Sequence, residues 1–527
     1  MTKSLRLLCV PLILAALSGQ ALATEWRLTG SNTLRFEHYH ITGDESSSPY
    51  AHSGSHFFND LNLSLTRQQA SGSLWRFNFA GVANYSDYRH SETGLIPERM
   101  SMLYERTDVA LPFRVELGDQ YMNVSRLTLQ RSMKAMRLEL MPLSAVDGRK
   151  HSLTLFAGAA ETDWLSFDAS ASQYRGASWA MADNALGRLS ANVVYHSREN
   201  DEGVVEHSEW VGSLLAERSF NFSHQRLHAQ GEWARHFTDH ETHCDRNGQD
   251  RAVTAKISGQ DRLRPLSYEV SYERFGEDYA PAGTTLRSDY RGIAAQAGLG
   301  LGGGYEVSGR GHWVTYGVDS PNPVHAETFG VSMSGPLNRW APRPILGQGE
   351  VTLQTRNSES GHIDTQATTT RLNLTLPNRG ETRIGLLWSE FDSRHTVGTD
   401  RITRRVSVNH GRKGVFGRTE LDLRAGFAYQ EVKGNNPQQT LNPTLSLTAA
   451  RAGHSIGANL GYHRFDTDVT ADAGVDTYTF GMNYQYRDGP HTVGIQVDHH
   501  LRDPEAGEET ESWRAGVFWR YSFDHGW

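Results

Sequence analysis

Apolar and polar residues alternate with a period of two along most of the chain. Residues 75–85 place aromatic and small side chains on one face, and Arg76 and Asn84 on the other. Residues 371–376 and 420–429 alternate in the same way. Successive side chains point to opposite faces of a strand, so this pattern predicts β-strands with one apolar and one polar face. The longer runs have about ten residues, the length with which a tilted strand crosses a bilayer.

The connections between these runs alternate between short and long. Short turns are predicted at residues 69–72, 183–187, 302–304, 377–380, 411–414, 451–453 and 488–489. Long polar connections are predicted near residues 41–55, 87–97, 198–208, 238–249, 277–288, 317–326, 392–400, 432–440, 467–475 and 502–510. Short turns on one rim and longer loops on the other are typical of transmembrane barrels. The sequence therefore predicts an all-β fold, a large transmembrane antiparallel β-barrel of about 22–26 strands.

The strand count depends most on one part of the chain. Residues 111–121 and 151–160 have the pattern of strands. Residues 122–150 between them fit one strand, two strands, or an inward-folded, plug-like segment. Apart from this segment, residues 24–527 are expected to form a single barrel domain.

The N-terminus has the features of a secretory signal peptide. Lys3 and Arg6 provide positive charge, and residues 7–17 form an apolar run too short to span a bilayer. Residues 21–23 form a small-x-small cleavage site, so residues 1–23 are expected to be removed. Cleavage would leave Cys244 as the one cysteine, which excludes a disulfide within the mature chain.

Composition and charge exclude several classes of protein. No stretch of the sequence approaches eighteen consecutive apolar residues, which excludes a helical membrane protein. The formal net charge of −8 argues against a nucleic-acid partner, because such partners require basic surfaces.

The last strand-like run of the sequence carries a second kind of signal. One face of this run is apolar and largely aromatic, and it consists of Trp513, Ala515, Val517, Trp519, Tyr521 and Phe523. The run resembles the C-terminal signature of bacterial outer-membrane β-barrels. That resemblance implies recognition of Trp513, Val517, Trp519, Tyr521 and Phe523 by the barrel-assembly machinery, with delivery by periplasmic chaperones. It also implies a location in the outer membrane of a Gram-negative bacterium, in contact with lipid and lipopolysaccharide. We expect this strand to pair with residues 26–40 and so close the barrel.

A shorter resemblance concerns the early part of the barrel. Residues 111–121 (Leu-Pro-Phe-Arg-Val-Glu-Leu-Gly-Asp-Gln-Tyr) are followed by an amphipathic stretch that contains arginine. This region is similar to the early barrel of fimbrial ushers, in which a strand ending in Gly-Asp precedes another strand and then a plug. The soluble N- and C-terminal domains of ushers have no counterpart in the sequence. The resemblance implies an export-type barrel.

The expected size of the barrel indicates what it does. Barrels of about eight strands are filled by side chains, whereas those of about 16–18 strands leave a water channel. The prediction is therefore an outer-membrane channel for export of a macromolecule, either a protein or a polysaccharide. The alternatives are a general diffusion porin for bulky solutes and a structural or adhesin-anchoring barrel. The long loops or residues 122–150 would narrow the lumen.

No catalytic site and no cofactor are expected. Histidine and serine are scattered, and the one Gly-x-Ser-x-Gly match, residues 453–457, enters a strand where a nucleophile elbow requires a helix. One predicted loop gathers metal-ligand types, with His240, His243 and Cys244 close to His236 and flanking aspartates. Their spacing fits no defined zinc finger, so a solvated polar loop is the alternative.

Overall fold

The computed structural model describes residues 24–69, 72–86, 88, 92–141, 149–161, 164–165, 168, 172–199, 204–239, 249–337, 345–377, 380–394, 399–434, 436–467 and 474–526. The expected signal peptide, residues 1–23, lies outside the described residues and stays a prediction. Within the described residues, no helix is long and apolar enough to cross a bilayer.

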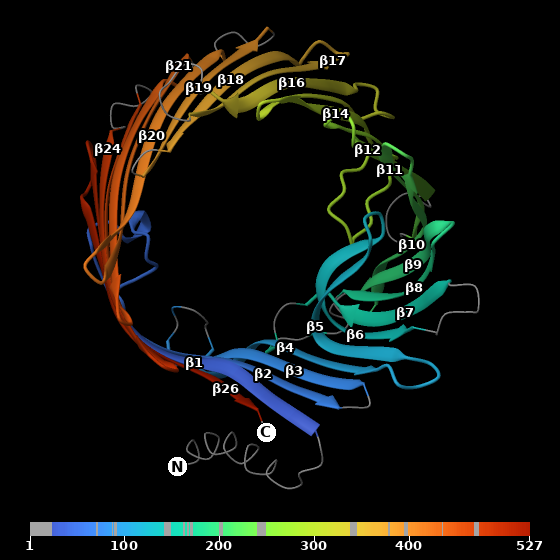
Figure 1. Ribbon diagram of the computed structural model, residues 1–527, viewed down its shortest axis with the longest axis horizontal. Coiled ribbons are helices and arrows are strands. Elements are labelled where there is room, and N and C mark those ends of the chain that lie inside the picture. Colours follow the sequence, from blue (N-terminus) through green and yellow to red (C-terminus); the bar gives the residue numbers. More distant parts are fainter. Residues whose placement is uncertain are drawn as a thin grey trace.

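The chain forms one antiparallel sheet of 26 strands that closes on itself (Figure 1). The first half of the sheet consists of β1 (Thr24–Thr42), β2 (Gly54–Gln69), β3 (Ser73–Asn84), β4 (Gly94–Arg106), β5 (Phe113–Ser125), β6 (Leu129–Leu140), β7 (Lys150–Ala159), β8 (Gln173–Asp183), β9 (Gly187–Glu199), β10 (Val205–Asn221), β11 (Gln225–Asp239), β12 (Gln249–Asp261) and β13 (Leu266–Phe275). The second half consists of β14 (Tyr290–Gly302), β15 (Tyr305–Tyr316), β16 (Val324–Pro336), β17 (Leu346–Ser358), β18 (Asp364–Pro377), β19 (Glu381–Ser393), β20 (Arg401–Phe416), β21 (Thr419–Gly434), β22 (Gln438–Arg451), β23 (His454–Thr467), β24 (Val475–Asp488), β25 (His491–Pro504) and β26 (Thr510–Gly526). A short 3-10 turn, η2 (Glu45–Ser47), lies in the first loop.

The two ends of the sheet are joined as the sequence predicts. β26 pairs with β1 along its length, from Arg27 opposite Gly526 to Thr42 opposite Glu511. Arg27 and Asp524 form an ion pair of 2.6 Å near one end of this seam. Closure leaves neither terminal strand as an open edge, which a barrel in a bilayer requires. The fold class, and a strand count within the predicted range, are confirmed.

The two faces of the wall differ in polarity. Large apolar side chains on the outer face are exposed, such as Trp233, Trp388 and Val406. Since side chains alternate along a strand and Trp233 of β11 is exposed on the outer face, the inner face carries Arg226, His228, Gln230 and Glu232, as predicted. For β20 the sequence did not indicate which side chains face the lumen and which face outward. Arg404 shares the outer face with Val406, and its guanidinium lies 4.5 Å from the ring centroid of Trp388.

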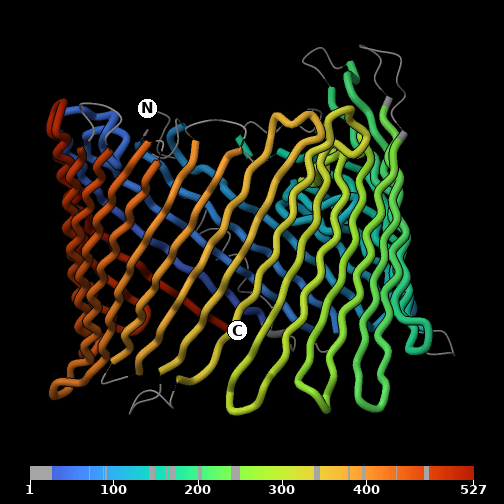
Figure 2. Tube along the Cα trace, turned by 90° about the horizontal axis from the view of Figure 1, so that it is seen from above, coloured from blue at the N-terminus to red at the C-terminus, as the bar shows by residue number. Residues whose placement is uncertain are grey.

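Figure 2 shows the tilted strands and the two rims, with tight turns on one rim and larger connections on the other. The predicted alternation of short and long connections holds at most positions, but the turn predicted at residues 411–414 is wrong, because these residues belong to β20 and the chain turns at residues 417–418. The β7–β8 connection, residues 160–172, and the β17–β18 turn, residues 359–363, were not among the predicted loops. Residues 205–208, assigned from the sequence to a polar loop, belong to β10 because their backbone pairs with β9.

Candidate functional site: the inward hairpin and its anchor

The β5–β6 hairpin leaves the wall and folds into the ring (Figure 1). β4 pairs with β5 only from Arg106 opposite Phe113 to Ser101 opposite Gly118. Gly118 has a φ of +96°, and a Cβ atom there would lie 2.2 Å from the Met100 carbonyl oxygen. A glycine is therefore required at the point where β5 turns away from β4.

The next residue compensates for the pairing that β5 gives up. A carboxylate oxygen of Asp119 accepts the backbone N–H of Met100 at 2.7 Å. Asp119 also accepts the indole N–H of Trp164 at 2.7 Å and lies 3.3 Å from the buried ammonium group of Lys134. The Gly-Asp pair that carries the resemblance to usher barrels thus marks the departure of the hairpin from the wall.

Residues 122–140 belong to β5, the hairpin turn and β6, whereas residues 142–148 lie outside the described part of the chain. An apolar cluster holds the hairpin against the inner wall, and it contains Met122, Leu129, Met133, Ala135, Phe156, Tyr174 and Val194. Leu127 at the turn joins a second cluster with Ala234, Ala252, Phe275 and Tyr279. Both clusters remove apolar side chains from the water of the lumen, which favours the docked position.

The β13–β14 loop, residues 276–289, meets the hairpin from the other side. The hydroxyl of Tyr279 donates to the carbonyl oxygen of Leu127 at 2.7 Å, and the backbone N–H of Gln130 donates to the Gly283 carbonyl at 2.8 Å. Tyr279 is fully buried, and this burial raises the pKa of its hydroxyl above the ordinary value. The hydroxyl therefore stays protonated and able to donate.

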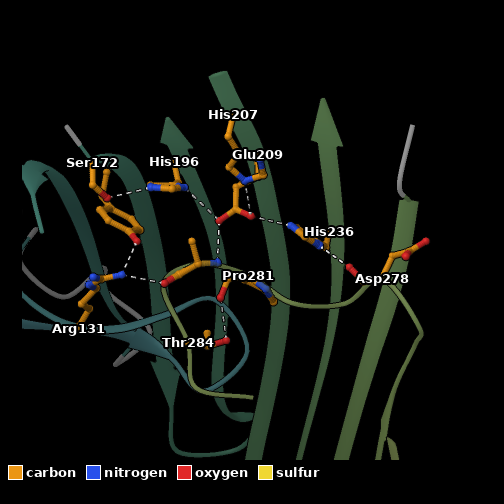
Figure 3. Close-up of polar contacts among 11 residues, drawn as sticks. Arg131, Ser172, His196, His207, Glu209, His236, Asp278, Pro281 and Thr284 are labelled. Atoms are coloured by element: carbon orange, nitrogen blue, oxygen red, sulfur yellow. Dashed lines mark hydrogen bonds and ion pairs between the residues drawn. The ribbon is translucent and has the colours of Figure 1, made fainter. Parts of the chain in front are cut away.

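Glu209 on β10 anchors this loop to the wall (Figure 3). One carboxylate oxygen accepts the backbone N–H of Ala282 at 2.8 Å, and the other accepts a hydrogen bond from Nε2 of His236 on β11 at 2.9 Å. The Glu209 side chain is 3% exposed, so its charge requires these donors. Glu209 thus links the wall to the loop, and the loop to the hairpin.

The ring of His236 is held at both nitrogens. Nδ1 lies 3.0 Å from the carbonyl oxygen of Asp278, which can only accept, so Nδ1 carries a proton. Nε2 faces the carboxylate of Glu209, which also accepts. His236 thus links the carboxylate of Glu209 on β10 to the backbone of the β13–β14 loop, and its side chain is only 2% exposed.

A second set of polar contacts lies nearer the hairpin turn. Ser125 is hydrogen-bonded to Thr128 at 2.8 Å and to Ser213 of β10 at 3.4 Å. Arg126 forms an ion pair with Glu273 of β13. The hairpin is therefore attached by hydroxyls and ions as well as by its apolar cluster.

The residues singled out from the sequence have different outcomes. His240, His243 and Cys244 lie outside the described residues, so a metal site in that loop stays a prediction. Their neighbour His236 points toward Glu209. The residues of the predicted assembly signal lie on β26, and they are Trp513, Val517, Trp519, Tyr521 and Phe523. The first three are exposed on its outer face. Their role in assembly also stays a prediction.

The sequence alone did not indicate a role for Glu209, His196, His207 or Tyr279. The consecutive strands β9 and β10 place the two histidines and Glu209 on one inner patch, because His196 pairs opposite Glu209 and His207 precedes Glu209 by two residues on the same face. Histidine or glutamate at inward positions of three successive strands is a signal that could have indicated the patch. Assigning residues 198–208 to a loop concealed it.

No protein-family description matches the chain, and no curated protein matches it. Among solved structures, the chain is similar to the P pilus usher (PapC) translocation pore, with 10% identity over 94% of this chain and 99% of that chain and a TM-score of 0.34. It is also similar to OccK2 (OpdF) of Pseudomonas aeruginosa, with 11% identity over 70% of this chain and 98% of that chain and a TM-score of 0.34. It is similar as well to a mutant ferric enterobactin receptor (PfeA) of the same species, with 9% identity over 96% of this chain and 81% of that chain and a TM-score of 0.41. These similarities concern the barrel fold alone, and the assignment of the chain to large closed antiparallel β-barrels rests on its own ring of 26 paired strands.

Proposed function

We propose that the protein is an outer-membrane channel that exports a macromolecule, either a protein or a polysaccharide. The observation that carries this proposal is the closed ring of 26 strands. With strands about 4.8 Å apart and tilted by about 40°, such a ring is roughly 50 Å across between backbones. A ring of this width can surround a folded small domain or a hydrated polymer.

The chemistry of the inner wall supports passage of hydrophilic cargo. A groove of about 660 Å³ crosses the inner face of β10–β17, and its lining mixes arginine, glutamate, glutamine and serine. Within it, Arg310 pairs with Glu350 at 2.6 Å, and Ser308 is hydrogen-bonded to Ser332 at 2.7 Å. Mixed charges and hydroxyls favour a hydrated polymer over an ion of one sign, because ion selectivity uses like-charged rings.

The hairpin and the β13–β14 loop would narrow this lumen. Their polar contacts with the wall, including Glu209 with Ala282 and Ser125 with Ser213, can be exchanged for contacts with water. The attachment can therefore be reversible, and displacement of the segment would admit cargo.

The alternative channel function is a general diffusion porin for bulky solutes, since the same polar wall would serve it. A third function is a structural or adhesin-anchoring barrel. Single-channel recording in planar bilayers, with neutral polymers of graded size added, tests all three. Export and diffusion both require conductance, and a barrel without conductance in every variant would overturn the channel proposal. A deletion strain separates the first two, because loss of a surface or secreted macromolecule supports export and loss of solute uptake supports diffusion.

An outward row of arginines supports contact with a phosphate-bearing lipid such as lipopolysaccharide. Arg235 pairs opposite Arg251, and Arg274 pairs opposite Arg291, in adjacent strands near one rim. All four side chains lie on the outer face that also carries Trp233. Like charges directly opposite each other destabilise a sheet, so anionic phosphates that bind between them would offset the repulsion.

This lipid contact is tested by replacing Arg251 and Arg291 with glutamine. We expect less lipopolysaccharide to co-purify with the barrel than with the wild type. Arg404→Gln is the matched control, because Arg404 is also on the outer face but lies 3.7 Å from Glu431. Equal lipid content in all three proteins would contradict the proposal.

A further inference from the structure

Three ligand-type side chains meet where the wall anchors the inward loop. His196 on β9, His207 on β10 and Glu209 on β10 each offer a ligand atom, and these atoms lie within 4.8 Å of one another. His196 and Glu209 are direct cross-strand partners, and His207 lies two residues before Glu209 on the same face. Four-coordinate zinc has bonds of about 2.0–2.1 Å to histidine and carboxylate, so small side-chain rotations would complete a site.

The contacts of His196 orient its ring so that Nδ1 faces the carboxylate of Glu209. Its Nε2 is 3.0 Å from the hydroxyl of Ser172, and its Nδ1 is 3.5 Å from a carboxylate oxygen of Glu209. The His196 side chain is 7% exposed, and its Nδ1 has no hydrogen-bond partner among the described residues. A buried ring nitrogen without a partner is costly. A metal ion between the carboxylate of Glu209 and Nδ1 of His196 would give this nitrogen a partner.

The outer contacts also have the form that metal sites use. Metal-binding histidines are usually oriented by a hydrogen bond at the other ring nitrogen. Ser172 provides that contact for His196, and the Asp278 carbonyl provides it for His236, whose Nε2 faces Glu209. A water molecule could occupy the fourth position.

We propose that His196, His207 and Glu209 form a binding site for Zn²⁺ or a chemically similar divalent transition metal. Two imidazoles and one carboxylate form a ligand set that zinc accepts, with one position open. The site would join β9 to β10 directly beneath the loop residue Ala282, which Glu209 holds. The proposed ligand set includes none of the loop candidates His240, His243 and Cys244.

Isothermal titration with Zn²⁺ tests the site on the detergent-solubilised full barrel after treatment with a chelator. We expect one Zn²⁺ per chain for the wild type and loss of that binding in the double variant His196→Asn, His207→Asn. Binding should persist in His228→Asn. That control removes a histidine of the same inner wall, which lies 3.5 Å from Glu217 and 3.0 Å from the Ser219 hydroxyl, both on β10. Heat-modifiable migration on gels confirms that each variant is a folded barrel.

A loop variant distinguishes the two predicted metal sites. Replacement of His240 and His243 by asparagine and of Cys244 by serine should leave the Zn²⁺ stoichiometry unchanged. Absence of Zn²⁺ binding in the wild type would overturn the proposal. Loss of binding in the loop variant, with binding kept in the His196, His207 variant, would also overturn it.

Two further measurements keep the proposal falsifiable if the double variant does not fold. His207 is the least buried of the three ligands, with 23% of its side chain exposed, so His207→Asn alone should fold and lose most of the affinity. Ser172→Ala should weaken binding by about tenfold, the effect of removing an orienting contact. Electron paramagnetic resonance of bound Cu²⁺ should show nitrogen couplings in the wild type that decrease in His207→Asn. Unchanged affinity and unchanged couplings in His207→Asn would contradict the assignment.

Discussion

The wall formed by β8–β13 and the wall formed by β16–β24 have the same architecture but different inner surfaces. On the first side the hairpin and the β13–β14 loop cover the strands, and Glu209 and His236 are buried beneath them. On the second side the inner face is an open polar groove, of about 870 Å³ across β19–β24, in which Arg424 pairs with Asp422 at the surface. In Figure 1 the hairpin formed by β5 and β6 lies inside the ring, next to β7–β10.

The difference shows where specific chemistry can develop in such a barrel. An exposed inner pair such as Arg424 and Asp422 is screened by water and contributes little. The pair of Glu209 with His236 is enclosed, so each partner depends on the other and removal of one leaves an unpaired buried charge. Substitutions on the covered side should therefore have larger consequences than matched substitutions on the open side.

The largest effect is expected at the seam that both sides depend on. Replacement of Tyr521 and Phe523 by aspartate should abolish assembly, because the apolar face of β26 would present charges to lipid and to the assembly machinery. Heat-modifiable migration in outer-membrane fractions measures insertion. Ser522→Asp, between the two positions and on the inner face, is the control that should still insert. Normal insertion of the Tyr521, Phe523 variant would contradict the proposed signal.

A cysteine pair tests whether the hairpin lies against the covered side. Ser125→Cys with Ser213→Cys, in a Cys244→Ser background, should form a disulfide in most molecules because the two hydroxyl oxygens are 3.4 Å apart. A shift in migration on non-reducing gels measures the cross-link. Ser125→Cys with Thr369→Cys, a residue of β18 on the open side, should remain unlinked. Equal cross-linking of both pairs would show that the hairpin has no fixed side.

Glu209→Gln should loosen the β13–β14 loop. Hydrogen bonds to a charged group contribute about 1.5–3 kcal/mol, so the loop should open roughly 10- to 100-fold more often. Hydrogen exchange at the backbone N–H of Ala282 measures this opening. Glu217→Gln removes a carboxylate of the same strand whose partner His228 is partly exposed, and it should leave the exchange unchanged. An unchanged exchange rate at Ala282 in Glu209→Gln would contradict the assignment of Glu209 as the residue that holds the loop.

The smallest effect is expected for Tyr279→Phe. The change removes only the hydrogen bond to the Leu127 carbonyl, which contributes about 1 kcal/mol, so opening should rise roughly fivefold. The same exchange measurement applies to residues of the hairpin turn. Tyr290→Phe, at a partly buried tyrosine of the neighbouring strand β14, serves as the matched control. A larger effect in Tyr290→Phe than in Tyr279→Phe would show that the hydroxyl of Tyr279 does not hold the hairpin turn.

Much of the fold could be predicted from the sequence, because a period of two directly reports which face of a strand meets lipid. The same pattern predicted the pairing of β26 with β1. The covered side was less accessible, since its contacts join residues far apart in the chain. Tyr279 meets Leu127, and Glu209 meets Ala282, through the folding-in of two connections on one rim. Periodicity carries no information about such contacts.

Paired single-channel recordings test the central proposal most directly, that the protein is a channel narrowed from its covered side. The wild type is compared with a variant in which residues 277–288 are replaced by a short turn, and with a control shortened at residues 359–363 on the open side. We predict conductance in the wild type, a larger conductance in the first variant, and wild-type conductance in the control. Absence of conductance in all three, or equal conductance in the first variant and the wild type, would contradict it.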